Sequence, residues 1–597
     1  MSVTPRGMSV QEAYREYRAG NFRVNRRYQR KLVWTREEQA ALIDSILCGY
    51  PIPLILLAFH TDASGKKSFE ILDGMQRLNA IFKFVENDFE VEGKFFDVQH
   101  LSRAKQLADA GSFKANQDPA KFLEANRCAD FADYTLAVSE FPGGDEEAVH
   151  EVFGRINSYG RRLSEQEKRQ AGVVSGFADA VRSLAAEIRG DVSAESLDLS
   201  EMPAISIDVS GENQPYGVKA ADSFWCKQGI LRKTQLRDSE DEQLLADIAI
   251  SVLEDEPFAF SGKALDEYYR PGSDDAKEVE RKLAAYGATK LKTEILGTIS
   301  ILREVIERVN SAPNALRQIV VPGSANPVKT AFFAVFFAFF ELCVRQKKSP
   351  KAAASIVEAL SGLQQKLSVA AGQIRSQPRK KNIQLTTGLI QDYFDLQEPP
   401  ALMHSDGAAL PFENALRRSK LETGLFECKQ GLHRLDNTRQ RDAELLPRIV
   451  QTLCGIANCG AEIDGALFIG VADDEKDHRR IQELDGVIAP HVANRFVVGV
   501  DRELRYASLD LESYFRLVVD FIANSKLSEP LRADILSRCD CINYRGASVI
   551  CLWVQPQTAA SAVDDKLYIR VGSSTQEAIG AQAMGAVFRR FSDAPAD

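Results

Sequence analysis

The sequence predicts a multidomain α+β protein. Its 597 residues are too many for one core, since single domains usually hold about 50 to 250 residues. Strand-like and helix-like runs alternate at both ends, in residues 1–210 and 412–590, whereas helical periodicity dominates residues 211–396. A stretch at 397–411 contains Pro and Gly, which is typical of a linker. We therefore expect three structured regions and one linker.

Composition excludes several classes of protein. The net charge of −10 argues against coating of nucleic acid through a global basic field, although it permits a local basic groove. The ten cysteines form no C-x-x-C pair, so we expect neither structural zinc nor a disulfide framework. The most apolar run, 331–340, is shorter than the roughly 20 residues of a membrane span and predicts a buried helix. We expect a cytoplasmic protein with no membrane partner.

The first region contains a segment suited to binding phosphate. Two strand-like runs, 54–59 and 68–72, precede Asp73-Gly74-Met75-Gln76-Arg77, and a helix-like run follows to Val85. Gln76 and Arg77 then lie in the first turn of a helix, whose free N–H groups and dipole attract anions. The alternative is an ordinary Asp-Gly turn with an arginine facing solvent.

Two further clusters carry similar chemistry. One is Tyr28-Gln29-Arg30 followed by Val33-Trp34, and the other is Phe153-Gly154-Arg155-Ile156-Asn157. Guanidinium groups and amides are donors that bind anions. Nearby, Ser164 and Glu167 have the spacing of a capping box, and for these two residues we favour the structural interpretation.

Together these three clusters resemble the N-terminal domain of the GmrSD-type restriction proteins, which is similar to the ParB and sulfiredoxin superfamily. The resemblance covers roughly residues 10–200 and implies a ParB/sulfiredoxin-like α+β domain. It also implies binding and hydrolysis of a nucleoside triphosphate, used in bacterial defence against phage DNA. The pocket residues that it implies are Gln29, Arg30, Asp73, Gly74, Gln76, Arg77, Arg155 and Asn157. Met75 stands where the family usually has Gln, which removes one polar group.

The chemistry of these side chains indicates their roles. Arg30, Arg77 and Arg155 would clamp phosphates, because guanidinium forks match phosphate oxygens. Asp73 would hold a magnesium ion or orient a water molecule, and the sequence leaves both roles open.

Helical periodicity continues through the middle region. The expected helices are Glu240 to Leu253, Ala276 to Lys290, Thr293 to Arg308, Thr330 to Gln346 and Ala352 to Ala370.

The last region places acidic residues at strand positions. Glu427 and Lys429 are two apart on an expected strand, 425–429, so both side chains point to one face. Glu422 precedes this strand, and Asp473 follows the expected strand 466–471. Carboxylates are the ligands that hard divalent cations prefer. Lys429 would neutralise nearby negative charge or orient the reacting group. The alternative is a surface strand with alternating charges.

The order of these motifs resembles the AlbA-like α/β domain of the Schlafen family, over about residues 411–580. The motifs are LETGLFECK, the helix ending at Ala457-Asn458, the strand end before Asp473 and the late strand KLYIRV. The resemblance implies nucleic-acid binding or, in nuclease members, metal-dependent cleavage by Glu422, Glu427 and Asp473. Two departures, a longer 459–465 segment and Ala472 in place of an acid, put Asp473 in doubt and leave Asp474 as a substitute.

No His-rich nuclease motif is visible in the C-terminal half, so a nuclease there would use carboxylates. Basic residues near these acids are candidate phosphate contacts, although a solvated surface is the alternative for each. They are Arg417, Arg418, Lys420, Lys429, Arg434, Arg439 and Arg441, with Arg479, Arg480 and Arg570 as weaker additions.

We therefore expect a two-part anti-phage effector. Its N-terminal domain would bind and hydrolyse a nucleoside triphosphate, and its C-terminal domain would cleave phage DNA or an RNA such as tRNA with Mg²⁺ or Mn²⁺. A homo-oligomer is possible. The alternatives are a C-terminal domain that binds nucleic acid without cutting, and a nucleotide-dependent DNA clamp of the ParB kind.

Overall fold

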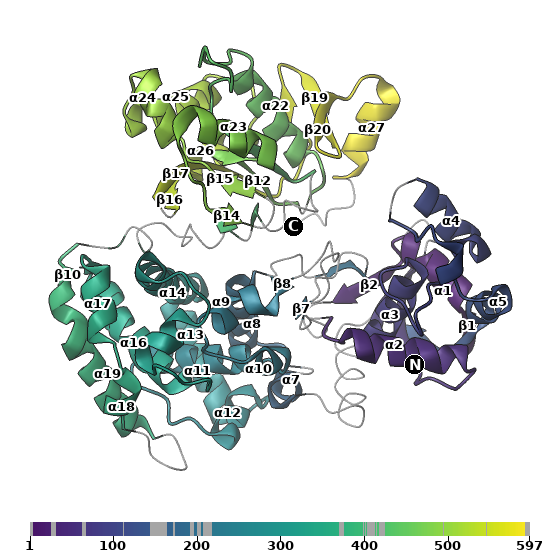
Figure 1. Cartoon of the computed structure of the whole chain (residues 1–597), viewed down its shortest axis with the longest axis horizontal. Helices are drawn as coiled ribbons and strands as arrows, with labels where there is room; N and C mark the ends of the chain where they lie inside the picture. The colour runs from purple at the N-terminus through teal and green to yellow at the C-terminus, as the bar shows by residue number, and fades with distance from the viewer. Residues whose placement is uncertain are drawn as a thin grey trace. The chain divides into compact units, whose positions relative to one another are not determined.

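The computed structural model of the chain divides into two compact units, Met1–Ser405 and Asp406–Asp597 (Figure 1). It describes residues 4–25, 32–61, 67–110, 113–143, 164–170, 173–190, 196–199, 205–206, 218–368, 375–397, 399, 402, 412–413, 415–416, 424–461, 463–492, 495–544 and 546–591. The unit boundary falls inside the stretch expected to be a linker. Helices and several sheets occur together, which confirms a multidomain α+β protein. The ParB-like and AlbA-like folds stay predictions.

The N-terminal part of the first unit is built on a six-stranded mixed sheet with the order β1-β5-β3-β4-β2-β6. Its elements are β1 Thr4–Ser9, α1 Val10–Arg18, β2 Phe22–Asn25, α2 Arg36–Leu47, β3 Ile55–Thr61, β4 Lys67–Asp73, α3 Met75–Val85, α4 Ser102–Asp109, α5 Ala125–Asp133, β5 Thr135–Pro142, α7 Glu165–Gln170, α8 Gly176–Arg189 and β6 Ser196–Asp198. The expected strands around the Asp-Gly segment are confirmed as β3 and β4, which pair antiparallel.

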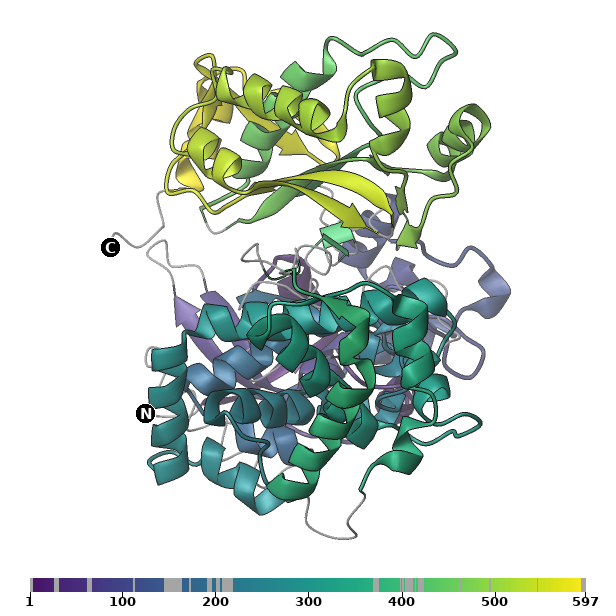
Figure 2. The same ribbon diagram turned by 90° about the vertical axis from the view of Figure 1, so that its left-hand side faces the viewer.

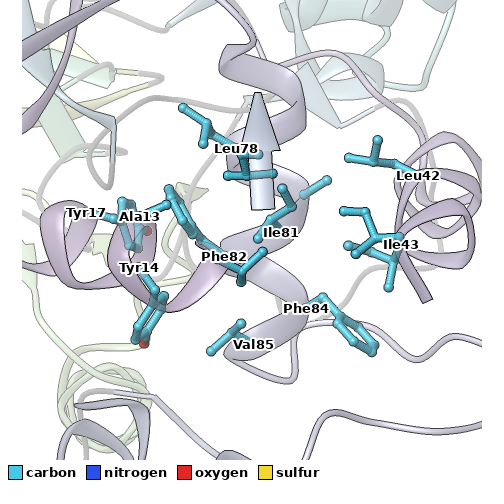
Figure 3. Close-up of a cluster of buried hydrophobic side chains, with 14 of the residues drawn as sticks. Ala13, Tyr14, Tyr17, Leu42, Ile43, Leu78, Ile81, Phe82, Phe84 and Val85 are labelled. Atoms are coloured by element: carbon cyan, nitrogen blue, oxygen red, sulfur yellow. The ribbon is translucent and has the colours of Figure 1, made fainter. Parts of the chain in front are cut away.

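Helix α3 lies at the centre of the core of this sheet domain. Figure 3 shows side chains of α1, among them Tyr17, and of α2, among them Ile43, meeting the helix that carries Leu78, Ile81 and Phe82. The rings of Tyr17 and Phe82 stack with centroids 4.3 Å apart. Apolar residues on more than one side of α3 are buried, so the helix is held firmly at the end of β4.

Gly74 makes the turn from β4 into α3. Its φ of +104° lies in the left-handed region, which side chains with a Cβ rarely adopt. A Cβ on Gly74 would also lie 3.0 Å from Ile55 Cγ1 on β3. Both conformation and space therefore require glycine at the start of α3.

The rest of the first unit is mainly helical. Its elements are β7 Ile205–Ser206, β8 Val218–Lys219, α9 Phe224–Lys227, α10 Lys233–Arg237, α11 Glu240–Glu254, α12 Gly262–Tyr269, α13 Asp274–Tyr286, α14 Ala288–Val309, α15 Ala315–Val320, α16 Lys329–Phe340, β9 Ser349–Pro350, α17 Ala353–Ala359, α18 Leu363–Lys366, α19 Ser376–Ile390 and β10 Phe394–Asp395. The long helix expected at 352–370 is instead two short ones, α17 and α18, separated by Gly362 with a φ of +65°.

The apolar run predicted to be a buried helix is α16. Every residue from Ala331 to Phe340 is buried, and α16 packs against α14 and α19 among the teal and green helices of Figure 2. No described helix is both long enough and apolar enough to cross a membrane.

The second unit is built on a four-stranded sheet with the order β11-β12-β17-β16, in which β11 and β12 are parallel. Its elements are β11 Phe426–Lys429, α22 Leu445–Ala457, β12 Gly465–Ile469, β13 Val471–Ala472, α23 Glu475–Asp485, β14 His491–Val492, β15 Arg495–Val497, α24 Asp501–Ala507, α25 Leu511–Ala523, α26 Leu531–Ser537, β16 Cys539–Tyr544, β17 Ala547–Val554, β18 Ala562–Val563, β19 Lys566–Val571, β20 Ser574–Glu577 and α27 Ala581–Arg589. Successive residues of β12 face opposite sides of the sheet and two separate cores. Leu467 packs with α22 and α25, and Phe468 packs on the opposite face with Phe412.

The strand expected at 466–471 is interrupted at Gly470. This residue has a φ of +110°, and a Cβ there would lie 3.0 Å from the carbonyl oxygen of Ser548. Gly470 N still donates to Lys429 O at 2.8 Å, so the chain stays beside β11 as it leaves the sheet. Asp473 therefore follows the short strand β13 near the carboxyl end of β11.

Candidate functional site

The structure brings two of the N-terminal motifs together through Gln76. The side-chain oxygen of Gln76, in the first turn of α3, accepts hydrogen bonds from Val33 N at 3.2 Å and Trp34 N at 3.4 Å. The segment that follows Tyr28-Gln29-Arg30 is therefore fixed against the start of α3. The N-cap residue of α3 is Gly74, which has no side chain that could cap the first N–H groups of the helix, and anions bind at such N–H groups.

Asp73 and Arg77 form a pair across the same turn. Arg77 Nη2 donates to Asp73 Oδ2 at 2.8 Å and to Leu54 O at 3.0 Å. Arg77 Nε is buried and has no hydrogen-bond partner among the described residues. The Arg77 side chain is 13% exposed and that of Asp73 is 41% exposed, so the carboxylate is the more accessible member.

Several of the predicted site residues lie outside the described residues. These are Gln29, Arg30, Arg155, Asn157 and Glu422. Their roles stay predictions. The predicted capping box is confirmed, because Glu167 N donates to Ser164 Oγ and Ser164 N donates to Glu167 Oε2.

In the second unit, Glu427 contacts a cation with each carboxylate oxygen. Lys429 Nζ lies 2.5 Å from Oε1, which confirms that the two side chains share one face of β11. Arg570 Nη2 donates to Oε2 at 2.7 Å. Arg570 comes from β19, and its side chain is only 2% exposed. It also donates hydrogen bonds to Gly424 O and Thr575 Oγ1. Arg570 is thus a buried partner of Glu427.

Asp473 forms the second acidic position. Arg495 Nη1 lies 3.0 Å from Asp473 Oδ1 and also donates to the Asp473 carbonyl oxygen at 2.8 Å. Partial burial and the negative charge of Glu427 raise the pKa of Asp473, and Arg495 opposes this change. Asp473 follows β13, which contacts β11, so the structure brings these two predicted acids near each other.

The charges of the described side chains nearly balance at this site. Three carboxylates, Glu427, Asp473 and Asp477, lie near three cations, Lys429, Arg570 and Arg495. No group of three His, Cys, Asp or Glu side chains suited to a metal ion occurs among the residues that the structure describes. Glu427 and Asp473 are already paired with cations, so a divalent ion would have to displace one of these partners. A metal site here requires Glu422 in addition.

Most of the described basic residues that were proposed to contact phosphate already have acidic partners. Arg439 pairs with Asp485, and Arg479 pairs with Glu475. Arg434 and Arg441 are exposed and form no ion pair with any described residue. Arg417, Arg418 and Lys420 lie outside the described residues. Two of the predicted contacts are therefore left available in the described structure.

Sequence reasoning missed Arg495 and the buried role of Arg570. Arg495 lies on β15, which pairs with β13, so sheet pairing alone brings it to Asp473. Nothing in the spacing of these residues marks them as partners of the acids.

Comparison with known proteins bears on the first motifs. Residues 10–174 match the family model of the GmrSD restriction endonuclease, N-terminal domain. This match confirms the resemblance of the N-terminal part. No match was found among curated proteins or among solved structures. The resemblance of residues 411–580 to the Schlafen AlbA-like domain has no such support and stays a prediction.

We expect Gln76→Leu to loosen the segment that contains Val33 and Trp34. The substitution leaves two backbone N–H groups without their acceptor, and an unmet buried donor costs about 1–3 kcal/mol. Hydrogen exchange of these two amides should become faster, whereas Gln76→Glu, which keeps an oxygen acceptor, should preserve their protection. Equal protection in both variants would show that Gln76 does not anchor this segment.

The raised pKa of Asp473 predicts an effect of pH on stability. The folded chain favours the protonated carboxyl group, so the contribution of this group to the free energy of unfolding is fully present below the unfolded pKa. That contribution is lost as pH rises through the folded pKa. We therefore expect Asp473→Asn to raise the unfolding temperature at pH 7, and the gain to shrink near pH 4.

The matched control is Asp564→Asn. Lys526 holds the pKa of Asp564 below its usual value, so this substitution should lower stability at pH 7. Calorimetry of the full chain at both pH values measures the two effects. A loss of stability in Asp473→Asn at pH 7 would contradict the expected sign of its effect.

Proposed function

We propose that the protein is an anti-phage effector with a nucleotide site in its first unit and a nucleic-acid site in its second. The observation that carries this proposal is the match of residues 10–174 to the N-terminal domain of a restriction endonuclease family. Restriction endonucleases act on DNA, so nucleic acid is the expected partner. The two hydrogen bonds from Val33 and Trp34 to Gln76 support the proposal, because they join two of the motifs that carry the resemblance.

In the first unit, we propose that a nucleoside triphosphate binds at the start of α3. Its phosphates would meet the N–H groups at the start of this helix and the guanidinium of Arg77. A phosphate would replace the Asp73 carboxylate as the partner of Arg77. Asp73 would then be free to hold Mg²⁺ or to orient a water molecule. Gln29, Arg30, Arg155 and Asn157 would complete this pocket.

In the second unit, we propose that nucleic acid is cleaved beside β11. Glu422, Glu427 and Asp473 would hold Mg²⁺ or Mn²⁺, which supplies charge stabilisation to a phosphoryl group when bound. Lys429 is 29% exposed and Arg570 is buried, so Lys429 is the partner of Glu427 that can move toward a phosphate.

A second candidate is a C-terminal unit that binds nucleic acid without cutting. The pairing of both Glu427 and Asp473 with cations favours it, because neither carboxylate is left open to a metal ion. In that case Lys429 would contact phosphate directly and no metal would be needed.

We expect Arg77→Ala to weaken nucleotide binding by about 10- to 100-fold. A hydrogen bond to a charged group contributes about 1.5–3 kcal/mol, and each 1.4 kcal/mol is tenfold in affinity. Titration calorimetry with ATP and GTP analogues measures the change, and hydrolysis should fall with it. The control is Arg103→Ala on α4, whose side chain bonds only to Gln106 among the described contacts. Unchanged binding in Arg77→Ala would exclude this pocket.

We expect the full chain to cleave phage DNA or tRNA with Mn²⁺ and to lose this activity with EDTA or in Glu427→Gln. Glutamine keeps the shape of the side chain but removes its charge. The matched control is Glu577→Gln, because Glu577 pairs with Lys566 at 3.1 Å on the exposed strand β20. Binding of the same substrates without cleavage under every nucleotide would favour the second candidate.

A further inference from the structure

A short hairpin follows β11 in the second unit. Arg434 N donates to Gln440 O at 2.9 Å, and Asp442 N donates to Leu432 O at 2.9 Å. His433 and Arg441 form an antiparallel bridge at its base. We refer to residues 432–442 as the arginine hairpin, because it carries Arg434 and Arg441, two exposed arginines that form no ion pair within the described part of the chain.

A single buried carboxylate anchors the base of the arginine hairpin. Glu503, on α24, is fully buried and accepts hydrogen bonds from Leu432 N at 2.9 Å and His433 N at 3.2 Å. Tyr514 OH donates to it at 2.6 Å and Arg502 Nη2 at 3.0 Å. Burial alone would raise the pKa of Glu503, but the bond from His433, the charge of Arg502 and the Tyr514 hydroxyl hold it below its usual value. Glu503 is therefore an anion in the folded chain.

The same carboxylate orients the imidazole of His433. Glu503 Oε2 lies 2.7 Å from His433 Nδ1, so an ionised Glu503 requires Nδ1 to carry the proton. In the neutral imidazole, Nε2 then carries the lone pair. It forms no hydrogen bond with the described residues, and the His433 side chain keeps about a tenth of its surface exposed. A histidine held by a carboxylate in this tautomer is the arrangement of a general base.

The sequence around His433 is adapted to this contact. A Cβ on Gly431 would collide with the Glu503 carboxylate. Further along the hairpin, Arg439 binds Asp485, and Arg480 Nη2 donates to Asn437 Oδ1 at 2.8 Å. The hairpin is thus fixed at its base and at its turn, which holds His433 in place before any ligand arrives.

We propose that His433 is the proton acceptor in hydrolysis of a phosphodiester by the second unit, with Arg434 and Arg441 holding the phosphates of the nucleic acid. This inference rests on the proposed cleavage. A water oxygen forms a bond to phosphorus while its proton passes to His433 Nε2. The bond from phosphorus to the leaving oxygen breaks, and that oxygen takes a proton from solvent. The imidazolium then returns its proton to water.

The alternative is a purely structural histidine that closes the hairpin. Both roles use the Nδ1 contact with Glu503, but only the proposed one uses Nε2. His433→Asn separates them, because the asparagine amide can still donate to Glu503 and has no basic nitrogen. The matched control is His491→Asn, since His491 is exposed on β14 and forms no described contact with this cluster.

The test measures cleavage of DNA and of tRNA by the full chain with Mn²⁺ between about pH 5 and 8, the range in which histidines titrate. Other charged or titratable groups near His433 are Arg502, Arg439, Tyr506, Tyr514 and Glu503. We expect a rate that rises with pH in the unaltered chain. His433→Asn should lower it by about 10²- to 10⁴-fold and remove the rise, with substrate binding and unfolding temperature unchanged.

Cleavage by His433→Asn at the rate and with the pH profile of the unaltered chain would overturn the inference while leaving the proposed function intact. An unaltered chain that never cleaves would overturn both. If His433→Asn loses activity, unfolds at a lower temperature than the unaltered chain and keeps the rise of the rate with pH, His433 has a structural role instead.

Discussion

Glu427 contacts a cation with each of its carboxylate oxygens, and the rest of the second site is arranged around that neutralisation. A partly buried carboxylate is stable only when its charge is matched. The match is unequal, because Arg570 is buried and held by Gly424 and Thr575, whereas Lys429 is partly exposed. One oxygen of Glu427 is therefore held by a buried partner, and the other is held by a partly exposed partner that can be exchanged. A ligand that enters this site competes with Lys429.

The first unit uses a similar arrangement at its predicted nucleotide site. Arg77 Nη2 already donates to Asp73 and to Leu54 O, while the side-chain oxygen of Gln76 accepts from the backbone of Val33 and Trp34. Gln76 is therefore a structural residue that joins two motifs, and the Asp73–Arg77 pair is the part that a phosphate can open. The pair keeps both charges matched until a ligand replaces one of them.

Much of the fold followed from periodicity, whereas the partners of the acids did not. The apolar run 331–340 is continuous and predicted the buried helix α16, and alternation predicted β11 with Glu427 and Lys429 on one face. Strand ends were harder to place, because Gly470 breaks the strand before Asp473 through a positive φ that no periodicity reveals. The partners Arg495 and Arg570 arrive through the pairing of distant strands, so local sequence carries no sign of them.

Glu503 was missed for a related reason. It lies in the mostly charged run Asp501-Arg502-Glu503-Leu504-Arg505, and an acid in such a run is usually solvent-exposed. It is buried because five donors from the hairpin, α24 and α25 converge on it, which offsets the cost of removing its charge from water. Such a carboxylate cannot take part in metal binding without losing these donors. Glu427 keeps one exchangeable partner, whereas Glu503 keeps none, so Glu427 is suited to meeting a ligand and Glu503 to holding His433 in one orientation.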